Sequence, residues 1–176
     1  MQVRILCLSQ ARHVAVTQEI RDFERLPSKK CFVIPNGYFR KENNLEEDKY
    51  AGDHAIDFLN EIQTRLLEER KKGNKILIFV GSGKFPWHGI ERIADLVEKL
   101  PSVFLLIVGD TADCEKIKQL QLMGRVLVVG FIDPNIMPRI YRMVDFGIGT
   151  FALDKKLMTQ ACPLKVREYL WYGLPV

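Results

Sequence analysis

Short apolar runs in the second part of the chain alternate with stretches whose apolar residues recur at helical spacing. The runs cover residues 76–80, 103–108, 126–129 and 146–151. Apolar runs of this length predict buried strands, and a helix between two strands lets them lie parallel. Because such crossovers are short and right-handed, the pattern predicts an α/β fold built on a doubly wound parallel sheet.

The helices between and after these runs carry start and stop signals. The clearest pattern covers 90–100, and a weaker one covers 114–122. A third helix is expected to begin at Pro134 with Asp133 as its cap, and a fourth ends at Gly173. The residues expected to face the core are Ile90, Ile93, Ala94, Val97 and Leu100 in the first helix, Ile136, Ile140, Met143 and Val144 in the third, and Val166, Tyr169 and Leu170 in the fourth.

The first 75 residues follow a different pattern. Short strands are predicted at 14–16 and 31–34, with a helix over 18–26 that takes Thr17 as its cap. The polar stretch 40–50 is typical of a linker. A longer helix follows, with an apolar stripe formed by Ile56, Leu59, Ile62 and Leu66.

The loop after the first long strand, VGSGKFPWHGIERI at 80–93, has a composition typical of phosphate binding but fits neither common motif. A P-loop would need a glycine at Ile78 and a hydroxyl residue at Phe85. A dinucleotide fingerprint would need a glycine at Pro86. The setting, between a buried strand and a helix, still points free backbone N–H groups at the crevice above the sheet.

Composition limits the classes of function. The chain has 176 residues and a net charge of +4, without the basic stripe of a nucleic-acid-binding protein. The cysteines stand at 7, 31, 114 and 162 with no C-x-x-C pair, which argues against a zinc site or a disulfide framework and favours a cytoplasmic protein with reduced thiols. No apolar run approaches the roughly 18 to 20 residues that span a bilayer.

Five motifs occur in an order that resembles a known family. They are VIPNGYF (33–39), IFVGSGKFPWHGIERI (78–93), LLIVGD (105–110), VLVVGFID (126–133) and CPLKVREYLWYGLPV (162–176). In this order they resemble the nucleotide-sugar-binding half of retaining GT-B glycosyltransferases of the family 4 type. The resemblance implies a Rossmann-like half of a GT-B fold over 41–176, truncated at its carboxyl end. It also implies that 1–40 are a remnant of the amino-terminal domain and the crossover segment.

The resemblance assigns a diphosphate end to the site. In the family a basic residue follows the loop glycine and a lysine precedes the next glycine, and this sequence has Ser82 and His88 at those positions. Lys84 and Lys165 are expected to supply the missing positive charge, and His88 contributes to it when protonated. Lys84, His88 and Lys165 are therefore the expected catalytic residues.

The resemblance also assigns a sugar and ribose end. The family carries two glutamates eight positions apart, and here Gln160 takes the first position and Glu168 the second. A carboxylate accepts hydrogen bonds from two neighbouring hydroxyls, whereas the amide brings no charge. Altered sugar preference or reduced activity is expected. The predicted donor-binding residues are Gly81, Ser82, Gly83, Gly130, Phe131, Gln160, Leu164 and Glu168.

The function implied by the resemblance is transfer of a sugar, with retention, from a nucleoside diphosphate sugar to a glycan or lipid-linked acceptor. It implies no cofactor and no metal, an acceptor bound through the missing amino-terminal domain, and peripheral membrane association as an option for the intact protein. This piece alone is expected to bind nucleotide and to transfer little. Two alternatives stay open: a non-catalytic nucleotide-binding or interaction module of the same fold, and a dinucleotide-dependent oxidoreductase in which Asp110 would hold a ribose.

Overall fold

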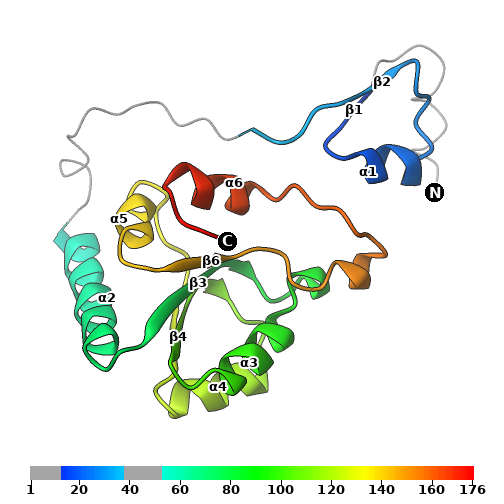
Figure 1. Cartoon of the computed structure of the whole chain (residues 1–176). Helices are drawn as coiled ribbons and strands as arrows, with labels where there is room; N and C mark the ends of the chain where they lie inside the picture. The colour runs from blue at the N-terminus through cyan, green and yellow to red at the C-terminus, as the bar shows by residue number, and fades with distance from the viewer. Residues whose placement is uncertain (1–12, 38–52) are drawn as a thin grey trace.

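The computed structural model describes residues 13–37 and 53–176, with side chains in the second range from residue 56 (Figure 1). Its larger part is a four-stranded parallel sheet of β3 (Lys75–Ser82), β4 (Val103–Asp110), β5 (Val126–Val129) and β6 (Phe146–Ile148). The strand order is β5-β4-β3-β6. The chain therefore winds outward from β3 in both directions, and the prediction of a doubly wound sheet is confirmed.

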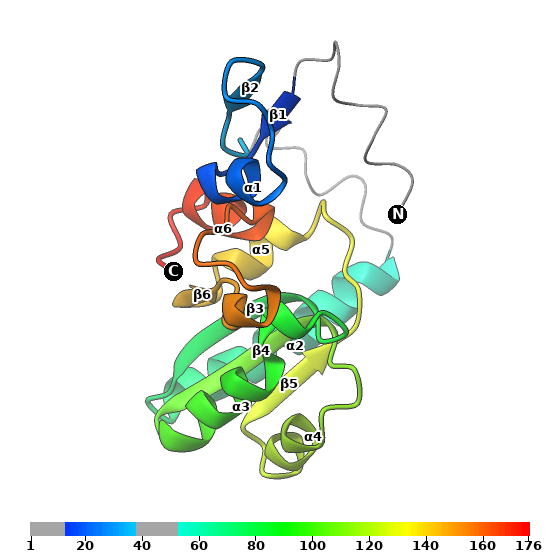
Figure 2. The same ribbon diagram turned by 90° about the vertical axis from the view of Figure 1, so that its right-hand side faces the viewer.

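Helices cover both faces of this sheet (Figures 1 and 2). One face packs α2 (Asp53–Lys71), α5 (Met137–Tyr141) and α6 (Leu164–Trp171) against inward residues of β3 and β4. The other face packs α3 (Ile90–Lys99) and α4 (Glu115–Leu122). Alternate residues of β4 enter the two clusters, as expected for a strand that is buried on both sides.

Tyr169 fixes α6 to the sheet. Its ring is fully buried, and its hydroxyl accepts a hydrogen bond from the backbone N–H of Val80 at 3.0 Å. Gly147 of β6 leaves room for the ring, because a Cβ atom there would lie 2.4 Å from Cδ2 of Tyr169. Tyr169 thus anchors α6 over β3 and β6.

Several local predictions need correction. Three residues that the sequence places in the core, Ile56, Leu100 and Leu170, are exposed, and Leu100 caps the end of α3 instead of packing inside it. The helix expected from Pro134 begins at Met137, because the Asp133 carboxylate accepts from Asn135 N at 2.8 Å and so caps a turn before the helix. The strand expected over 146–151 ends at Ile148, where the chain turns towards a 3₁₀ helix, η3 (Leu153–Lys156).

The N-terminal unit, residues 13–37, has a sheet of its own. It consists of β1 (His13–Ala15), α1 (Gln18–Phe23) and β2 (Cys31–Val33), with the two strands parallel. Thr17 caps α1 as predicted, its hydroxyl accepting from Ile20 N at 3.1 Å. The predicted linker at 40–50 and the predicted domain boundary after residue 40 lie outside the described residues.

Candidate functional site

The loops that follow β3 and β6 meet at the carboxyl end of the sheet, where the strand order reverses. The loop after β3 contains a short 3₁₀ helix, η2 (Pro86–His88). Phe151 N donates to His88 O at 3.3 Å, and Ala152 N donates to Trp87 O at 3.1 Å. A bidentate ion pair between Arg92 and Asp154, with both N–O distances at 2.7 Å, also ties α3 to η3. In open α/β sheets this reversal point is where ligands bind.

His88 is held close to the start of its own loop. Its Nδ1 lies 2.6 Å from the carbonyl oxygen of Ser82 and must donate, because a carbonyl only accepts. Burial lowers the pKa of His88 below its ordinary value, Lys165 adds to this, and the Ser82 hydrogen bond opposes it. The lowered pKa favours the neutral imidazole, with Nε2 as an acceptor, and works against the positive charge considered from the sequence.

Lys165 is a buried cation without an acceptor among the described residues. Its Nζ atom has essentially no contact with solvent and no hydrogen-bond partner, and it lies 4.0 Å from the centre of the Phe79 ring. Burial lowers the pKa of Lys165 to about 7. Contact with a ligand requires this side chain to turn away from Phe79.

Lys84 already has an anionic partner. Its ammonium lies 3.2 Å from Oδ2 of Asp110, which also accepts from the Ser82 hydroxyl at 3.4 Å. Ala112 N donates to Oδ1 of Asp110 at 2.5 Å. This hydrogen bond is the main cause of the lowered pKa of the Asp110 carboxyl, and the contact with Lys84 is the second. Asp110 is thus engaged by Ala112 of its own loop and by Ser82 and Lys84 from the end of β3, instead of being free for a ribose.

The glycines of this loop differ in what they allow. At Gly83 a Cβ would lie 2.6 Å from the carbonyl oxygen of Thr111, so a side chain would collide with the backbone of the next loop. Gly81 has φ near +150°, and a Cβ there would lie 3.2 Å from Cε1 of His88. Both residues let the loops after β3 and β4 and the His88 ring approach closely.

Gly130 and Phe131 lie away from this group. They follow β5, which β4 separates from β3. Phe131 is 85% exposed, and a Cβ on Gly130 would meet open space. These two predicted donor-binding residues thus stand at a different strand end from the loop that carries His88.

The 157–163 loop and α6 carry the remaining predicted residues. Lys165 and Glu168 stand three positions apart on α6, so they are neighbours on one side of the helix. Glu168 is half-buried, whereas Leu164 is 59% exposed. Gln160 is exposed, and its backbone N–H donates to Glu19 of the N-terminal unit at 2.5 Å.

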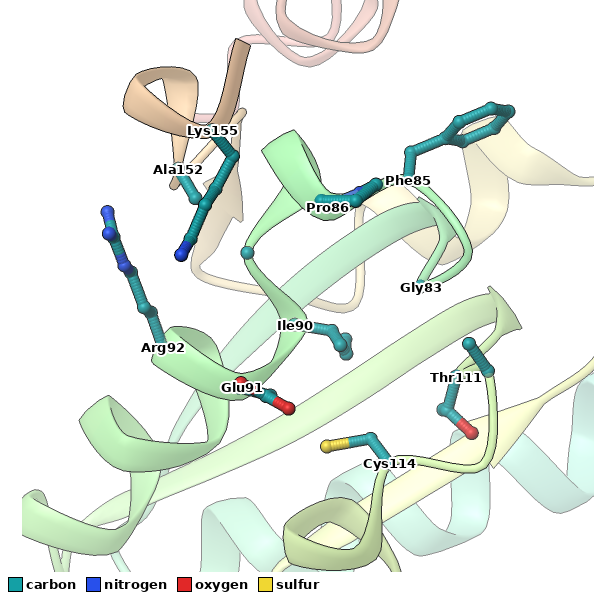
Figure 3. A pocket seen from close by; sticks show the side chains of 12 residues that line it. Gly83, Phe85, Pro86, Ile90, Glu91, Arg92, Thr111, Cys114, Ala152 and Lys155 are labelled. Carbon is teal, nitrogen blue, oxygen red and sulfur yellow. The ribbon is translucent and has the colours of Figure 1, made fainter. Parts of the chain in front are cut away.

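A cavity of about 380 Å³ opens beside the loop after β3, between α3, α4 and η3 (Figure 3). Arg92 and Lys155 lie on one side of it and Thr111 on the other, with Glu91 between them. Gly83 is the predicted donor-binding residue that lines it. A second cavity, of about 410 Å³, runs along β6 and the start of α6.

Three solved structures resemble the chain over most of its length. Sucrose-phosphate synthase from Thermosynechococcus elongatus has a TM-score of 0.60 and 21% identity, over 96% of this chain and 40% of that chain. HepE of Anabaena, in complex with UDP-glucose, has a TM-score of 0.52 and 20% identity, over 78% and 37%. A glycosyltransferase from Rickettsia africae has a TM-score of 0.50 and 18% identity, over 82% and 39%. The chain spans about two fifths of the length of these structures.

The chain has a GT-B Rossmann-like fold. The likeness shows the fold, and at this level the prediction from the five motifs is confirmed. No family model and no curated protein matches the sequence.

The GT-B domain brings some of the predicted residues together and leaves others apart. Gly81, Ser82, His88 and Lys165 form one group over Phe79, with Lys84 at its edge. Glu168 is a neighbour of Lys165 on α6 and so lies near this group. Gly130 and Phe131 lie at another strand end, and Leu164 and Gln160 are exposed.

Sequence reasoning missed the contact between the N-terminal unit and the GT-B domain. The Glu19 carboxylate binds the 157–163 loop, and Asn36 Nδ2 donates to Cys162 O at 2.6 Å. Glu19 and Thr159 are 140 positions apart in the sequence, and Asn36 and Cys162 are 126 positions apart. Local sequence patterns cannot predict a contact between residues so far apart in the chain.

The described residues offer no metal site, no disulfide and no membrane-spanning helix. They contain no group of three or more His, Cys, Asp or Glu side chains arranged to hold a metal ion. Cys31, Cys114 and Cys162 are free thiols. None of the helices in the described ranges combines the length and apolar character needed to cross a membrane.

Proposed function

We propose that this GT-B domain binds the donor of a glycosyltransferase that moves a sugar, with retention, from a nucleoside diphosphate sugar to a glycan or lipid-linked acceptor. The observation that carries the proposal is Lys165. A buried ammonium without an acceptor is unfavourable by itself, and it lies at the point of the fold where ligands bind. A diphosphate would supply the missing negative charge.

The proposed chemistry uses charge that develops as the donor breaks down. Loss of the nucleoside diphosphate from the anomeric carbon places negative charge on the leaving oxygens. A bound diphosphate would raise the pKa of Lys165 and keep it protonated, so that the cation is in place when the bond breaks. Neutral His88 would act through Nε2 as a hydrogen-bond acceptor, and Lys84 would first have to leave Asp110.

The sugar and ribose are assigned to α6 and the loop before it. Glu168 is proposed to accept from the ribose hydroxyls, and Gln160 to contact the sugar as an uncharged partner. Gly130 and Phe131 would border the base at the end of β5. The acceptor would bind through a second domain, no metal would take part, and the reaction would run in the cytoplasm, as the cysteine pattern predicts. The 1–40 and 41–176 boundaries belong to the same proposal.

A thermal-shift titration tests the donor assignment. UDP-, GDP- and ADP-sugars are added to the protein, and NADH serves as the dinucleotide comparison. A ligand that binds only the folded state at a hundred times its Kd stabilises the protein by about 2.7 kcal/mol. One of the nucleotide sugars is expected to raise Tm in a saturable way, while NADH leaves it unchanged.

Variants at the two departures from the family pattern localise the site. Gln160→Glu and His88→Lys restore the family's residue types and are expected to change the affinity for the best donor, whereas Lys99→Met on the exposed end of α3 is the control. Absence of saturable binding by every nucleotide sugar contradicts the donor assignment and favours the interaction module. A shift with NADH alone favours the oxidoreductase.

A further inference from the structure

Two consecutive backbone N–H groups of the 157–163 loop converge on a carboxylate from the N-terminal unit. Thr159 N donates to Oε1 and Oε2 of Glu19 at 2.7 and 2.9 Å, and Gln160 N donates to Oε2 at 2.5 Å. The Thr159 hydroxyl adds a third donor, 3.2 Å from Oε1. The backbone hydrogen bonds from Thr159 and Gln160 lower the pKa of Glu19, so this group is an anion at neutral pH.

The same loop holds the N-terminal unit at a second point. Asn36 Nδ2 donates to the carbonyl oxygen of Cys162 at 2.6 Å, and Cys162 Sγ lies 3.9 Å from the carbonyl oxygen of Asn36. Through these contacts α1 lies beside the loop that precedes α6, as Figure 2 shows. The start of α1 and the exit from β2 are therefore both fastened to the segment that leads into α6.

Adjacent N–H groups that point at one centre form a nest, which binds carboxylate and phosphate oxygens alike. We propose that Thr159 N–H, Gln160 N–H and the Thr159 hydroxyl form an oxyanion site, that Glu19 fills it from within the chain, and that a phosphate oxygen of the donor displaces Glu19. The identity of the displacing ligand rests on the proposed function; the oxyanion site itself rests on the contacts with Glu19.

Competition has a reciprocal consequence. An anion that takes these N–H groups weakens the attachment of the N-terminal unit by the same factor by which Glu19 weakens the binding of the anion. Removal of the Glu19 charge should therefore tighten anion binding.

The test uses ¹⁵N-labelled protein, amide NMR and inorganic diphosphate as the probe. In the unmodified protein the Thr159 and Gln160 amide protons are expected downfield, and Glu19→Gln should move them upfield. Diphosphate should restore the downfield positions and should bind the variant roughly tenfold more tightly than the unmodified protein. Asp22→Asn is the matched control, because Asp22 lies on the same helix and bonds to Gln18 and Arg21. It should behave like the unmodified protein.

Equal or weaker diphosphate binding by Glu19→Gln, or amide shifts that ignore the substitution, would overturn the oxyanion site. A parallel titration with UDP-, GDP- and ADP-sugars separates the two proposals. Diphosphate binding as expected with no response to any nucleotide sugar keeps the oxyanion site and removes the donor assignment. Nucleotide-sugar binding at unchanged Thr159 and Gln160 signals keeps the donor assignment and removes the competition.

Discussion

Lys165 combines a positive charge with burial against an aromatic ring, and this conflict has a pH signature. Its pKa is lowered from 10.5 to about 7 on folding. Between pH 7 and pH 10.5 the unfolded chain therefore binds more protons than the folded protein does. The free energy of unfolding thus rises with pH from about 7 towards 10.5. At pH 6 the folded protein carries the full cost of the buried charge.

Lys165→Met should therefore stabilise the unliganded protein at pH 6 by roughly 2 to 4 kcal/mol, and by much less at pH 10. Urea denaturation at both pH values measures the difference, and Lys99→Met controls for the loss of a lysine on the surface. The same Lys165→Met change should abolish the Tm increase given by the best donor. An equal effect on stability at both pH values would show that burial of charge is not the cause.

Among the described glycines, Gly109 leaves the least room for a side chain. It has φ near +125°, and a Cβ there would lie 2.0 Å from the carbonyl oxygen of Gly81 on the neighbouring strand. Gly109→Ala should cost more than about 3 kcal/mol of unfolding free energy, because the ends of β3 and β4 must separate. Gly130→Ala is the matched control, since its Cβ meets nothing within 4 Å. Chemical denaturation that gave the two variants similar stability would contradict the close approach.

At the scale of the element, α6 depends on Tyr169 for its position. Tyr169→Phe keeps the ring but leaves Val80 N without its partner, and should cost about 1 to 2 kcal/mol. Because Lys165 and Glu168 are on the same helix, the Tyr169→Phe protein should also bind the donor more weakly. Tyr172→Phe, at the residue that follows α6, keeps the Val80 bond and is the comparison. A Tyr169→Phe protein with unchanged midpoint in urea would mean that ring packing alone holds α6.

At the scale of the molecule, the described members of the two core clusters all lie between residues 59 and 174. A chain reduced to 53–176 should therefore unfold cooperatively, with Tm within a few degrees of the full chain, followed by circular dichroism. Because it lacks Glu19, it should also bind diphosphate like Glu19→Gln. Loss of cooperative unfolding would show that the N-terminal unit completes the core.

Most of the elements of the sheet could be predicted from the sequence, because apolar periodicity reports burial directly. The four strands, α3 and the Thr17 cap follow from local patterns of this kind. Ile56, Leu100 and Leu170 were misplaced because an apolar residue at the margin or the end of a helix stripe can face either way. Asp133 caps a turn because its side chain reaches the N–H two residues on.

For the candidate site, the sequence by itself determined which residues stand at the ends of strands, since chain order fixes that. Only the tertiary structure decided the charge and the hydrogen-bond partners of these residues. Asp110 neutralises Lys84, burial leaves His88 uncharged and Lys165 without an acceptor, and Glu19 occupies the N–H groups of Thr159 and Gln160. The physical reason is that charge state and hydrogen bonding depend on neighbours distant in the chain, whereas periodicity records only which side of a strand or helix is buried.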